Sequence, residues 1–366
     1  MAISRPLKRK IQLHDSIFHM KLSEFDYDLP EELIAQEPAP MRDHSRMMVL
    51  NRGDGSRKNR RFSELPEFLR EGDVLVINDS RVIPARLVGR KTSGGLIEML
   101  LLRERTSETA GSPVAWEVHL RPAKRVEAGT KIFFEAPAEA EIVERLSDKK
   151  WVVRFDTPGP FEDFLAECGR APLPPYIKRD RQTGKSRKDL ERYQTVYARV
   201  PGSVAAPTAG LHFSDDVLES IRHKGVSTAA VTLHVGYGTF LPIESENVED
   251  HRMEEEFFEM TEEATSTING ALRVIAVGTT AVRVIESTAD DSGKVAATSG
   301  CTALFIHPGY RFRRVGALLT NFHLPKSSLY ILVCAFAGRD LVRAAYGRAV
   351  EEKYRFYSYG DCMLIT

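Results

Sequence analysis

One group in this 366-residue chain that could take part in catalysis is a histidine at the end of a predicted strand. The segment 231–243 reads VTLHVGYGTFLPI, so His234 lies late in the strand and is followed by Gly236 and Tyr237. Ligands of α/β sheets bind beyond the carboxyl ends of the strands. The pattern predicts either a ligand site at these residues or a core histidine with satisfied hydrogen bonds, and it leaves both possibilities open.

A short charged cluster follows this segment. Glu249, Asp250, His251 and Arg252 are consecutive in the chain. Carboxylates and imidazoles are the groups that most often transfer protons in enzymes. The cluster therefore indicates either acid–base chemistry or an ordinary solvated loop.

The segment 193–213 could hold a ligand through its backbone. It reads YQTVYARVPGSVAAPTAGLHF and carries Thr208, Gly210 and His212 near its end. Small side chains leave backbone N–H groups open to close approach by a bound molecule. The alternative is a buried connector between two elements.

Another short segment could bind an anion. Gly278, Thr279 and Thr280 lie between a predicted strand and a predicted helix, with Arg283 one turn further on. The amide groups at a helix N-terminus attract negative charge. The segment is neither a G-x-G-x-x-G fingerprint nor a P-loop, so no motif indicates a dinucleotide or a nucleoside triphosphate.

Positive charge is concentrated between residues 177 and 192. Seven Lys and Arg outnumber three Asp and Glu there, and Lys178, Arg179, Arg181 and Lys185 are among the seven. Such a cluster can follow a phosphate backbone, although a solvated loop is the alternative. These four residues are our candidates for binding nucleic acid.

The residues that could bind a metal lack the spacing that metal sites need. The histidines show neither the i, i+4 spacing nor the HExxH context of zinc sites, and the four cysteines form no C-x-x-C pair. We therefore expect no metal, and we expect the chain to work in a reducing cytoplasm.

Two kinds of element must position these groups. Short β segments separated by Gly and Pro follow one another between residues 62 and 156, a spacing typical of a small antiparallel barrel. The flanking regions 20–61 and 157–366 alternate strand-like and helix-like segments, with strands expected at 226–235, 274–277, 303–306 and 317–320. We predict an α/β main domain with an inserted small antiparallel β-barrel domain, preceded by a disordered extension over residues 1–19.

The composition indicates a globular protein. The 51 Lys and Arg balance the 51 Asp and Glu, and 42% of the residues are hydrophobic, which argues against a disordered acidic protein and a uniformly basic one. The longest apolar run, at residues 329–337, is far shorter than the roughly 18 residues of a membrane helix. We expect a monomer that does not contact membranes.

Several long motifs resemble one family. They are LPPYIKR (173–179), YQTVYARVPGSVAAPTAGLHF (193–213), VTLHVGYGTFLPI (231–243), EDHRM (249–253), VIAVGTTAVRVIES (274–287), TNFHLPKSSLYILVCAFAG (320–338) and EEKYRFYSYGDCMLI (351–365). From residue 20 to its end, the chain resembles the S-adenosylmethionine:tRNA ribosyltransferase-isomerases. It departs from them in a shorter turn between Asn269 and Arg273 and in His307, where a Tyr is usual.

The resemblance implies an enzyme of queuosine biosynthesis. Its substrates are S-adenosylmethionine, a co-substrate, and a tRNA that carries 7-aminomethyl-7-deazaguanine at the wobble position. The ribosyl part of S-adenosylmethionine is transferred and rearranged, which leaves epoxyqueuosine in the tRNA and releases adenine and methionine. The family fold is an inserted antiparallel β-barrel on an unusual α/β domain, in line with the pattern above.

This reaction requires a base near the ribose C5′ and an acid for the departing adenine. Our candidates for these proton transfers are His234, Asp250 and His251, with His212 and His323 as the next choices. We expect the co-substrate to bind at Thr208, Gly210, His212, Gly236, Tyr237, Thr279 and Arg283. An aromatic residue such as Tyr237 could face the sulfonium cation.

Two other functions remain as alternatives. A methyltransferase that uses the same co-substrate would carry a glycine-rich loop after its first strand, and no such loop is seen. A non-catalytic tRNA-binding module would use the barrel for RNA. That hypothesis leaves the Gly, His and Thr segments without a role.

Overall fold

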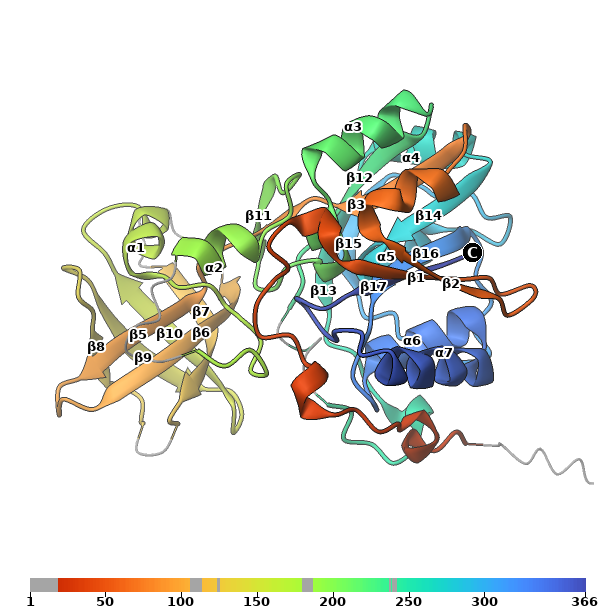
Figure 1. The fold of residues 1–366 in the computed structure, drawn as a ribbon. Helices are drawn as coiled ribbons and strands as arrows, with labels where there is room; N and C mark the ends of the chain where they lie inside the picture. Colours follow the sequence, from red (N-terminus) through yellow and green to blue (C-terminus); the bar gives the residue numbers. More distant parts are fainter. Residues whose placement is uncertain (1–18, 106–113, 124–125, 180–186, 237, 239–241) are drawn as a thin grey trace, which may run out of the picture.

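The computed structural model describes residues 19–105, 114–123, 126–179, 187–236, 238 and 242–366. Its larger domain is built on a nine-stranded mixed sheet with the order β15-β13-β12-β3-β14-β16-β17-β1-β2 (Figure 1). The strands of this sheet are β1 (Arg46–Leu50), β2 (Arg57–Arg61), β3 (Asp73–Asn78), β12 (Ser227–Leu233), β13 (Glu256–Met260), β14 (Arg273–Val277), β15 (Thr298–Thr302), β16 (Val315–Asn321) and β17 (Cys362–Ile365).

Four parallel strands form the centre of this sheet. β12 pairs with β3, β3 with β14 and β14 with β16, all in parallel. Runs such as DVLVIN in β3 are buried along their whole length, as expected for parallel strands with both faces covered. Because these strands run in one direction, their carboxyl ends, after Asn78, Leu233, Val277 and Asn321, lie along one edge of the sheet.

Helices cover both faces of the sheet. α4 (Glu262–Gly270), α5 (Gly278–Thr288), α6 (Ser328–Ala337) and α7 (Arg339–Glu351) pack on one face, and α3 (Asp215–His223) and η4 (Phe62–Phe68) on the other. As expected for a helix N-cap, the Ser214 hydroxyl accepts a hydrogen bond from the Val217 amide at 3.3 Å. The remaining helices that the structure describes are α1 (Phe161–Cys168), α2 (Arg187–Arg192), η1 (Leu22–Phe25), η2 (Glu31–Leu33), η3 (Arg42–His44), η5 (Thr208–His212) and η7 (Val248–Asp250).

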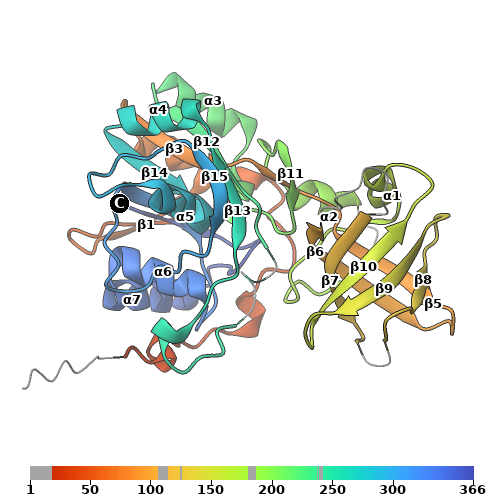
Figure 2. The ribbon, with the colours of Figure 1, turned by 180° about the vertical axis from the view of Figure 1, so that it is seen from behind.

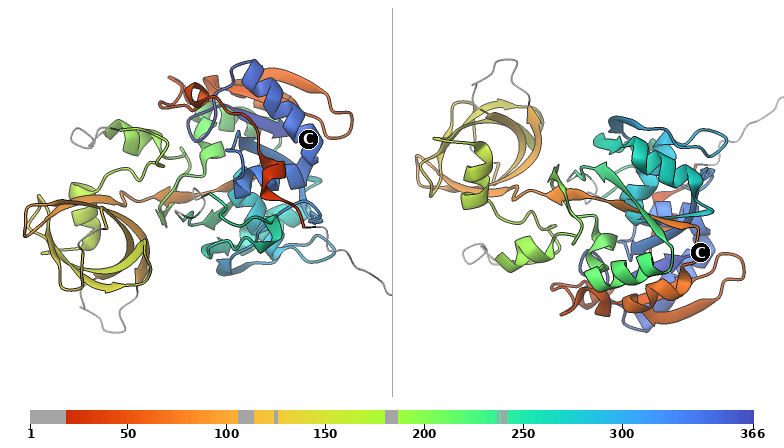
Figure 3. Two further views of the ribbon diagram at one scale, coloured as in Figure 1. Left: turned by 90° about the horizontal axis from the view of Figure 1, so that it is seen from below. Right: turned by 90° about the horizontal axis from the view of Figure 1, so that it is seen from above.

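The smaller domain is a closed antiparallel barrel with the strand order β10-β7-β6-β5-β8-β9, seen nearly end-on in Figure 3. Its strands are β5 (Arg86–Lys91), β6 (Leu96–Arg105), β7 (Val114–Arg121), β8 (Lys131–Phe133), β9 (Glu139–Arg145) and β10 (Lys150–Asp156). Trp116 and Phe155 belong to its core, and α1 adds Phe161 and Phe164 to the same cluster. The predicted α/β domain with an inserted antiparallel barrel is thereby confirmed.

Two strand assignments from the sequence are wrong. The segment 74–77 was expected in the barrel, but β3 is a central strand of the main sheet, between β12 and β14. The closed barrel therefore begins at Arg86 and not near residue 62. The strand expected at 303–306 lies earlier in the chain, as β15 (Thr298–Thr302).

Several contacts connect the two domains, which lie side by side in Figures 1 and 2. β4 (Ser80–Val82) and β11 (Val200–Ser203) form a small parallel sheet between them. Lys149 and Lys150, at the β9–β10 turn, form ion pairs with Glu244 and Glu254 of the main domain at 3.6 and 2.5 Å. In the described part of the chain, no helix has the length and apolar character needed to cross a membrane.

Candidate active site

His234 lies directly after β12, at the carboxyl edge of the parallel strands. Its ring stacks on Phe257 of β13, with centroids 5.8 Å apart and planes inclined by 21°. The ring also lies close to Gly202, where a Cβ atom would be only 2.9 Å from the His234 Cε1 atom. Gly202 also has a φ of +136°, so a side chain at this position would both strain the backbone and displace the imidazole.

Burial favours the neutral form of the His234 imidazole. Burial lowers its pKa below the ordinary value of 6.5, while the carboxylates of Asp79 and Glu259 act in the opposite direction. Its Nδ1 atom is buried and has no hydrogen-bond partner among the described residues. A neutral imidazole with an unused nitrogen can accept a proton.

Asp79 is a functional candidate that the sequence analysis missed. Its carboxylate accepts a hydrogen bond from the Thr232 hydroxyl at 2.7 Å and from Arg199 at 2.9 and 3.2 Å. The Asp79 side chain is 4% exposed, whereas that of Arg199 is 73% exposed. The buried Asp79 carboxylate thus lies near His234 and holds a solvent-facing guanidinium. The polar run Asn-Asp-Ser at the end of a buried strand was the signal for it.

Gly236 is held by a buried ion pair. Its amide donates to Glu256 Oε1 at 2.8 Å, and the other carboxylate oxygen of Glu256 accepts from Arg283. Arg283 also donates to the carbonyls of Thr302 and Leu304. All three nitrogens of this guanidinium thus donate hydrogen bonds to described residues. The structure therefore favours a positioning role for Arg283 over the direct ligand contact expected from the sequence.

The N-terminus of α5 lies at the same edge. Gly278 has a φ of +87°, a left-handed conformation that favours glycine. Thr279 and Thr280 follow it and are both buried. The Thr280 hydroxyl has no hydrogen-bond partner among the described residues.

Other buried polar atoms around this edge also lack partners among the described residues. They are the hydroxyl oxygens of Ser80, Thr195 and Tyr197. Only Asp79 separates Ser80 from the end of β3. The Tyr197 hydroxyl lies close to Gly210, in the segment that precedes α3. Buried polar groups are nearly always hydrogen-bonded, so a cluster of exceptions indicates a ligand site.

Gly210 and His212 are buried in the 208–212 segment, while Thr208 is half-buried at its start. A Cβ atom at Gly210 would lie 2.1 Å from the Tyr197 hydroxyl oxygen. His212 is buried and hydrogen-bonded through Nδ1 to the Ser45 hydroxyl at 2.6 Å and through Nε2 to Asn321 at 3.3 Å. These contacts agree with the buried-connector alternative for this part of the segment, and burial lowers the pKa of His212 to about 4.

We expect His212 to make the fold sensitive to acid. Its pKa in the folded protein is about 4, below the value near 6.5 of an unfolded chain, so the unfolded state binds the proton first as the pH falls. The free energy of unfolding should lose about 3 kcal/mol from this residue between pH 7 and pH 4. Urea unfolding of the wild type and His212→Gln at several pH values measures this difference. The exposed control His223→Gln should lose stability with falling pH in parallel with wild type. If the profile of His212→Gln is also parallel to that of wild type, His212 is not the source of the acid sensitivity.

Asp250 ends η7, and His251 directly follows it. Asp250 is exposed and accepts a hydrogen bond from Asn247 at 2.8 Å. His251 packs edge-on against Phe305 at 4.9 Å, and burial lowers its pKa. Within the described ranges, no hydrogen bond or ring contact joins either residue to His234.

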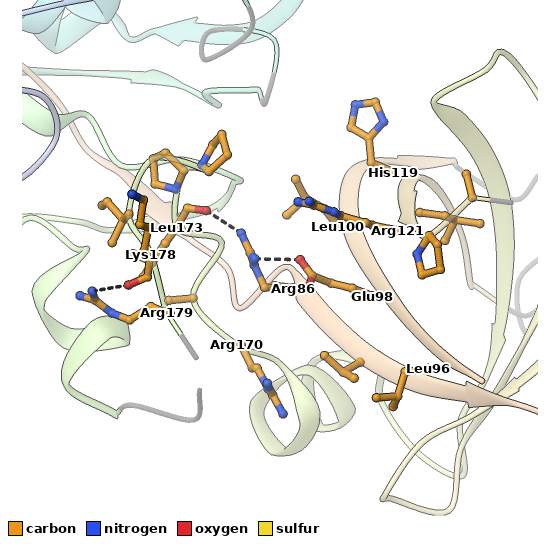
Figure 4. A pocket seen from close by; sticks show the side chains of 18 of the residues that line it. Arg86, Leu96, Glu98, Leu100, His119, Arg121, Arg170, Leu173, Lys178 and Arg179 are labelled. Carbon is orange, nitrogen blue, oxygen red and sulfur yellow. Dashed lines mark hydrogen bonds and ion pairs between the residues drawn. The ribbon is translucent and has the colours of Figure 1, made fainter. Parts of the chain in front are cut away.

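A cavity of about 740 Å³ lies between the barrel wall and the segment 170–179 (Figure 4). Glu98 forms an ion pair with Arg86 at 2.8 Å, and Arg86 also donates to the Leu173 carbonyl at 2.6 Å. Six basic and three acidic side chains line the cavity, the basic ones being Arg86, Arg121, Lys149, Arg170, Lys178 and Arg179. Two of the residues expected to bind nucleic acid, Lys178 and Arg179, thus lie at a basic cavity.

Three of the predicted site residues cannot be placed. Tyr237, Arg181 and Lys185 lie outside the described residues. Arg179 is paired with Asp189 at 3.0 Å, and Lys178 is paired with Glu31 at 2.5 Å. In the part of the chain that the structure describes, no three His, Cys, Asp or Glu side chains are grouped as a metal site would need.

Comparisons with known proteins agree with this architecture. The family model described as queuosine biosynthesis protein matches residues 22–365. A protein of Syntrophus aciditrophicus named S-adenosylmethionine:tRNA ribosyltransferase-isomerase is 55% identical over 360 residues, which cover 94% of this chain and 99% of that protein. A protein of Caldanaerobacter subterraneus with the same name is 50% identical over 94% of this chain and all of its own length.

A solved structure supports the same conclusion. The crystal structure of an S-adenosylmethionine tRNA ribosyltransferase from Thermotoga maritima is 37% identical, with a TM-score of 0.52, and the match covers 94% of this chain and all of that one. The resemblance seen in the sequence motifs is therefore confirmed. On these matches, which extend over nearly its whole length, the chain belongs to the queuosine biosynthesis protein family.

Proposed function

We propose that this chain is an S-adenosylmethionine:tRNA ribosyltransferase-isomerase. The observation that carries the proposal is the near full-length match, at up to 55% identity, to proteins of that name. The reaction transfers and isomerises the ribosyl part of S-adenosylmethionine onto 7-aminomethyl-7-deazaguanine at the wobble position of tRNA. Its products are epoxyqueuosine-tRNA, adenine and methionine.

His234 is the proposed base for this reaction. The positive sulfonium acidifies the neighbouring C5′–H of the ribose, so a modest base in a site shielded from water suffices. A neutral imidazole fits this requirement, and the lowered pKa of His234 keeps it neutral. The carboxylate of Asp79 beside it stabilises the imidazolium that forms. Asp250 and His251 remain candidates for the acid that assists adenine.

The unpartnered polar atoms at the sheet edge support a site for S-adenosylmethionine. They include the hydroxyls of Ser80 and Thr280, and both residues are more than nine-tenths buried. An adenosine and an amino acid together offer many donors and acceptors that such groups can satisfy. Thr208, Gly236 and Thr279 stay candidates for this binding, and Tyr237 stays a prediction.

The cavity beside the barrel is the proposed site of tRNA backbone contacts. Its basic side chains outnumber the acidic ones, and Lys178 and Arg121 lie at its exposed rim. Phosphate contacts supply most of the sequence-independent affinity for nucleic acids. The location between the two domains lets a single tRNA contact both.

The test of the proposed function uses S-adenosylmethionine labelled at two positions. Wild-type protein is incubated with tRNA that carries the precursor base and S-adenosylmethionine labelled in the ribose or in the methyl group. We expect the ribose label in the tRNA and the methyl label in free methionine. Methyl label in the tRNA would instead establish a methyltransferase, and tRNA binding without either label would establish a binding module.

Removing charge from the cavity should change how salt weakens tRNA binding. We expect the double variant Arg121→Ala, Lys178→Ala to bind tRNA more weakly and to lower the slope of log K against log salt concentration by about 0.7 to 0.9 for each phosphate that is no longer neutralised. Titrations at several salt concentrations measure the slope. The control is Lys294→Ala, Arg343→Ala, which removes two exposed charges from the main domain. Equal slopes for all three proteins would place the tRNA backbone on another surface.

A further inference from the structure

The outer face of β12 and β13 combines an aromatic ring, a carboxylate and a guanidinium. We call this surface the β12–β13 face and define it by Arg199, His234, Phe257 and Glu259. The antiparallel pairing of Thr232 with Glu259, and the hydrogen bond from the His234 amide to the Phe257 carbonyl at 2.9 Å, place His234, Phe257 and Glu259 on one side of the sheet. Arg199 is joined to Thr232 on the same side through the Asp79 carboxylate, which accepts hydrogen bonds from both residues. This end of the sheet lies toward the barrel in Figures 1 and 2.

Phe257 has the geometry of a stacking platform. Its ring is 42% exposed, although it lies in a domain that buries most of its large apolar side chains. One ring face is supported by the His234 imidazole, which stacks on it at 5.8 Å. Exposed aromatic rings that are held rigidly from behind are the usual partners of unstacked nucleic-acid bases.

Glu259 is positioned to read the edge of a base stacked on Phe257. Residues two positions apart on a strand point to the same side and are separated by about 7 Å. A carboxylate that accepts hydrogen bonds from the edge of a purine lies at a comparable distance from the ring centre. Glu259 is exposed and makes no hydrogen bond or ion pair with any described residue, so its carboxylate is available.

An exposed carboxylate on this face would distinguish a guanine-type base from adenine. A guanine-type base presents two donors on its Watson–Crick edge, the N1–H and the 2-amino group, and one carboxylate can accept from both. Adenine presents an acceptor at N1, which a carboxylate repels. Arg199, held by Asp79 and 73% exposed, adds a positive group suited to a neighbouring phosphate.

We propose that the β12–β13 face seats the wobble nucleotide of the tRNA, with Phe257 stacking on the base and Glu259 accepting from its N1–H and 2-amino groups. This inference rests on the proposed function, because that reaction supplies a guanine-type base with this Watson–Crick edge. In this arrangement the aminomethyl group of the base lies on the same face of the sheet as His234, where the ribosyl group must arrive. Glu259 is then a specificity-determining residue and Phe257 a binding residue.

The test measures binding of anticodon stem-loop RNAs that differ only at the wobble position. Loops with guanine, inosine or adenine are titrated against wild-type protein without S-adenosylmethionine, and binding is followed by fluorescence anisotropy. We expect the guanine loop to bind about 5- to 150-fold more tightly than the adenine loop, with inosine, which lacks the 2-amino group, between them. Equal binding of the three loops would overturn the proposal.

Two variants separate stacking from edge reading. Phe257→Ala should weaken all three loops by a similar factor, about 5- to 150-fold, because every base loses its stacking partner. Glu259→Ala should bind the three loops with nearly equal affinity, because only the discrimination is lost. A Phe257→Ala protein with wild-type affinities, or a Glu259→Ala protein that still prefers guanine, would exclude the assigned roles.

Matched controls exclude general effects of removing an aromatic ring or a charge. Phe133 on the barrel is also 42% exposed, and Phe133→Ala should bind all loops like wild type. Glu262→Ala removes an exposed carboxylate from α4, close in sequence to Glu259, and should keep the preference for guanine. If the two controls reproduce the losses of Phe257→Ala and Glu259→Ala, the β12–β13 face has no special role.

Failure of this proposal can be distinguished from failure of the proposed function. Wild-type protein that transfers ribose label to tRNA but binds the three loops equally would leave the function intact and refute only this nucleotide site. Wild-type protein that prefers the guanine loop but transfers no label would refute the function and retain the edge reading. The labelled transfer and the loop titration are therefore run on the same preparation.

Discussion

His234→Gln is expected to lower the single-turnover rate of ribosyl transfer by about 10²- to 10⁴-fold, the range typical of a lost general base. Glutamine has a polar head of similar size but cannot take up a proton at neutral pH. Rapid mixing of enzyme, labelled S-adenosylmethionine and saturating tRNA measures the chemical step. The wild-type rate should fall on acidification with a midpoint below pH 6.5, because burial lowers the pKa of His234 and the protonated ring is no longer a base.

A rescue experiment tests this role separately from any effect on folding. His234→Ala leaves space between Gly202 and Phe257, where the ring now packs. Added imidazole should restore part of the activity of this variant but not that of His234→Gln, in which the space is filled. His223→Gln, which changes an exposed histidine of α3, serves as the control and should keep the wild-type rate. Wild-type turnover by a folded His234→Gln protein would transfer the role of base to His251 or Asp250.

The second large effect concerns stability. Arg283→Met is expected to lower the free energy of unfolding by about 3 to 5 kcal/mol, because it leaves the Glu256 carboxylate buried without its cation. Both side chains of this pair are 4% exposed, so water cannot replace the missing partner. Urea unfolding followed by tryptophan fluorescence and by circular dichroism measures the loss.

A double variant distinguishes the buried ion pair from a ligand contact. Arg283→Met, Glu256→Gln removes both charges and keeps an acceptor for the Gly236 amide, so it should regain a large part of the lost stability. If Arg283→Met is as stable as wild type but no longer binds S-adenosylmethionine, Arg283 contacts the ligand directly, as expected from the sequence. The two outcomes predict opposite changes in stability and in affinity.

The histidines show what a sequence pattern can and cannot separate. His212 and His234 were both candidates for chemistry. The alternative was a buried connector for the segment of His212 and a core histidine for His234. In the structure, both ring nitrogens of His212 are within hydrogen-bonding distance of Ser45 and Asn321, whereas Nδ1 of His234 has no partner among the described residues. Partners 109 and 167 residues away in the chain made this difference, and a local pattern does not contain them.

The strand β3 shows a different limit. Its run of buried residues, DVLVIN, is followed by the turn that carries Asp79, and short barrel strands begin only a few residues later. Local spacing placed the run in the barrel. The lack of alternation between apolar and polar residues was a signal for a central parallel strand, since a barrel strand has one face toward solvent.

The sequence by itself determined the family, the α/β architecture with its inserted barrel, and the position of His234 at the end of a strand. These features depend on local periodicity and on long motifs, which a single chain carries in full. Only the tertiary structure decided that Asp79 and Phe257 lie beside His234, that Arg199 is paired with Asp79, and that Arg283 is paired with Glu256. The reason is physical: these contacts join residues between 23 and 155 positions apart in the chain, and only the pairing of the strands and the packing of α5 bring their side chains together.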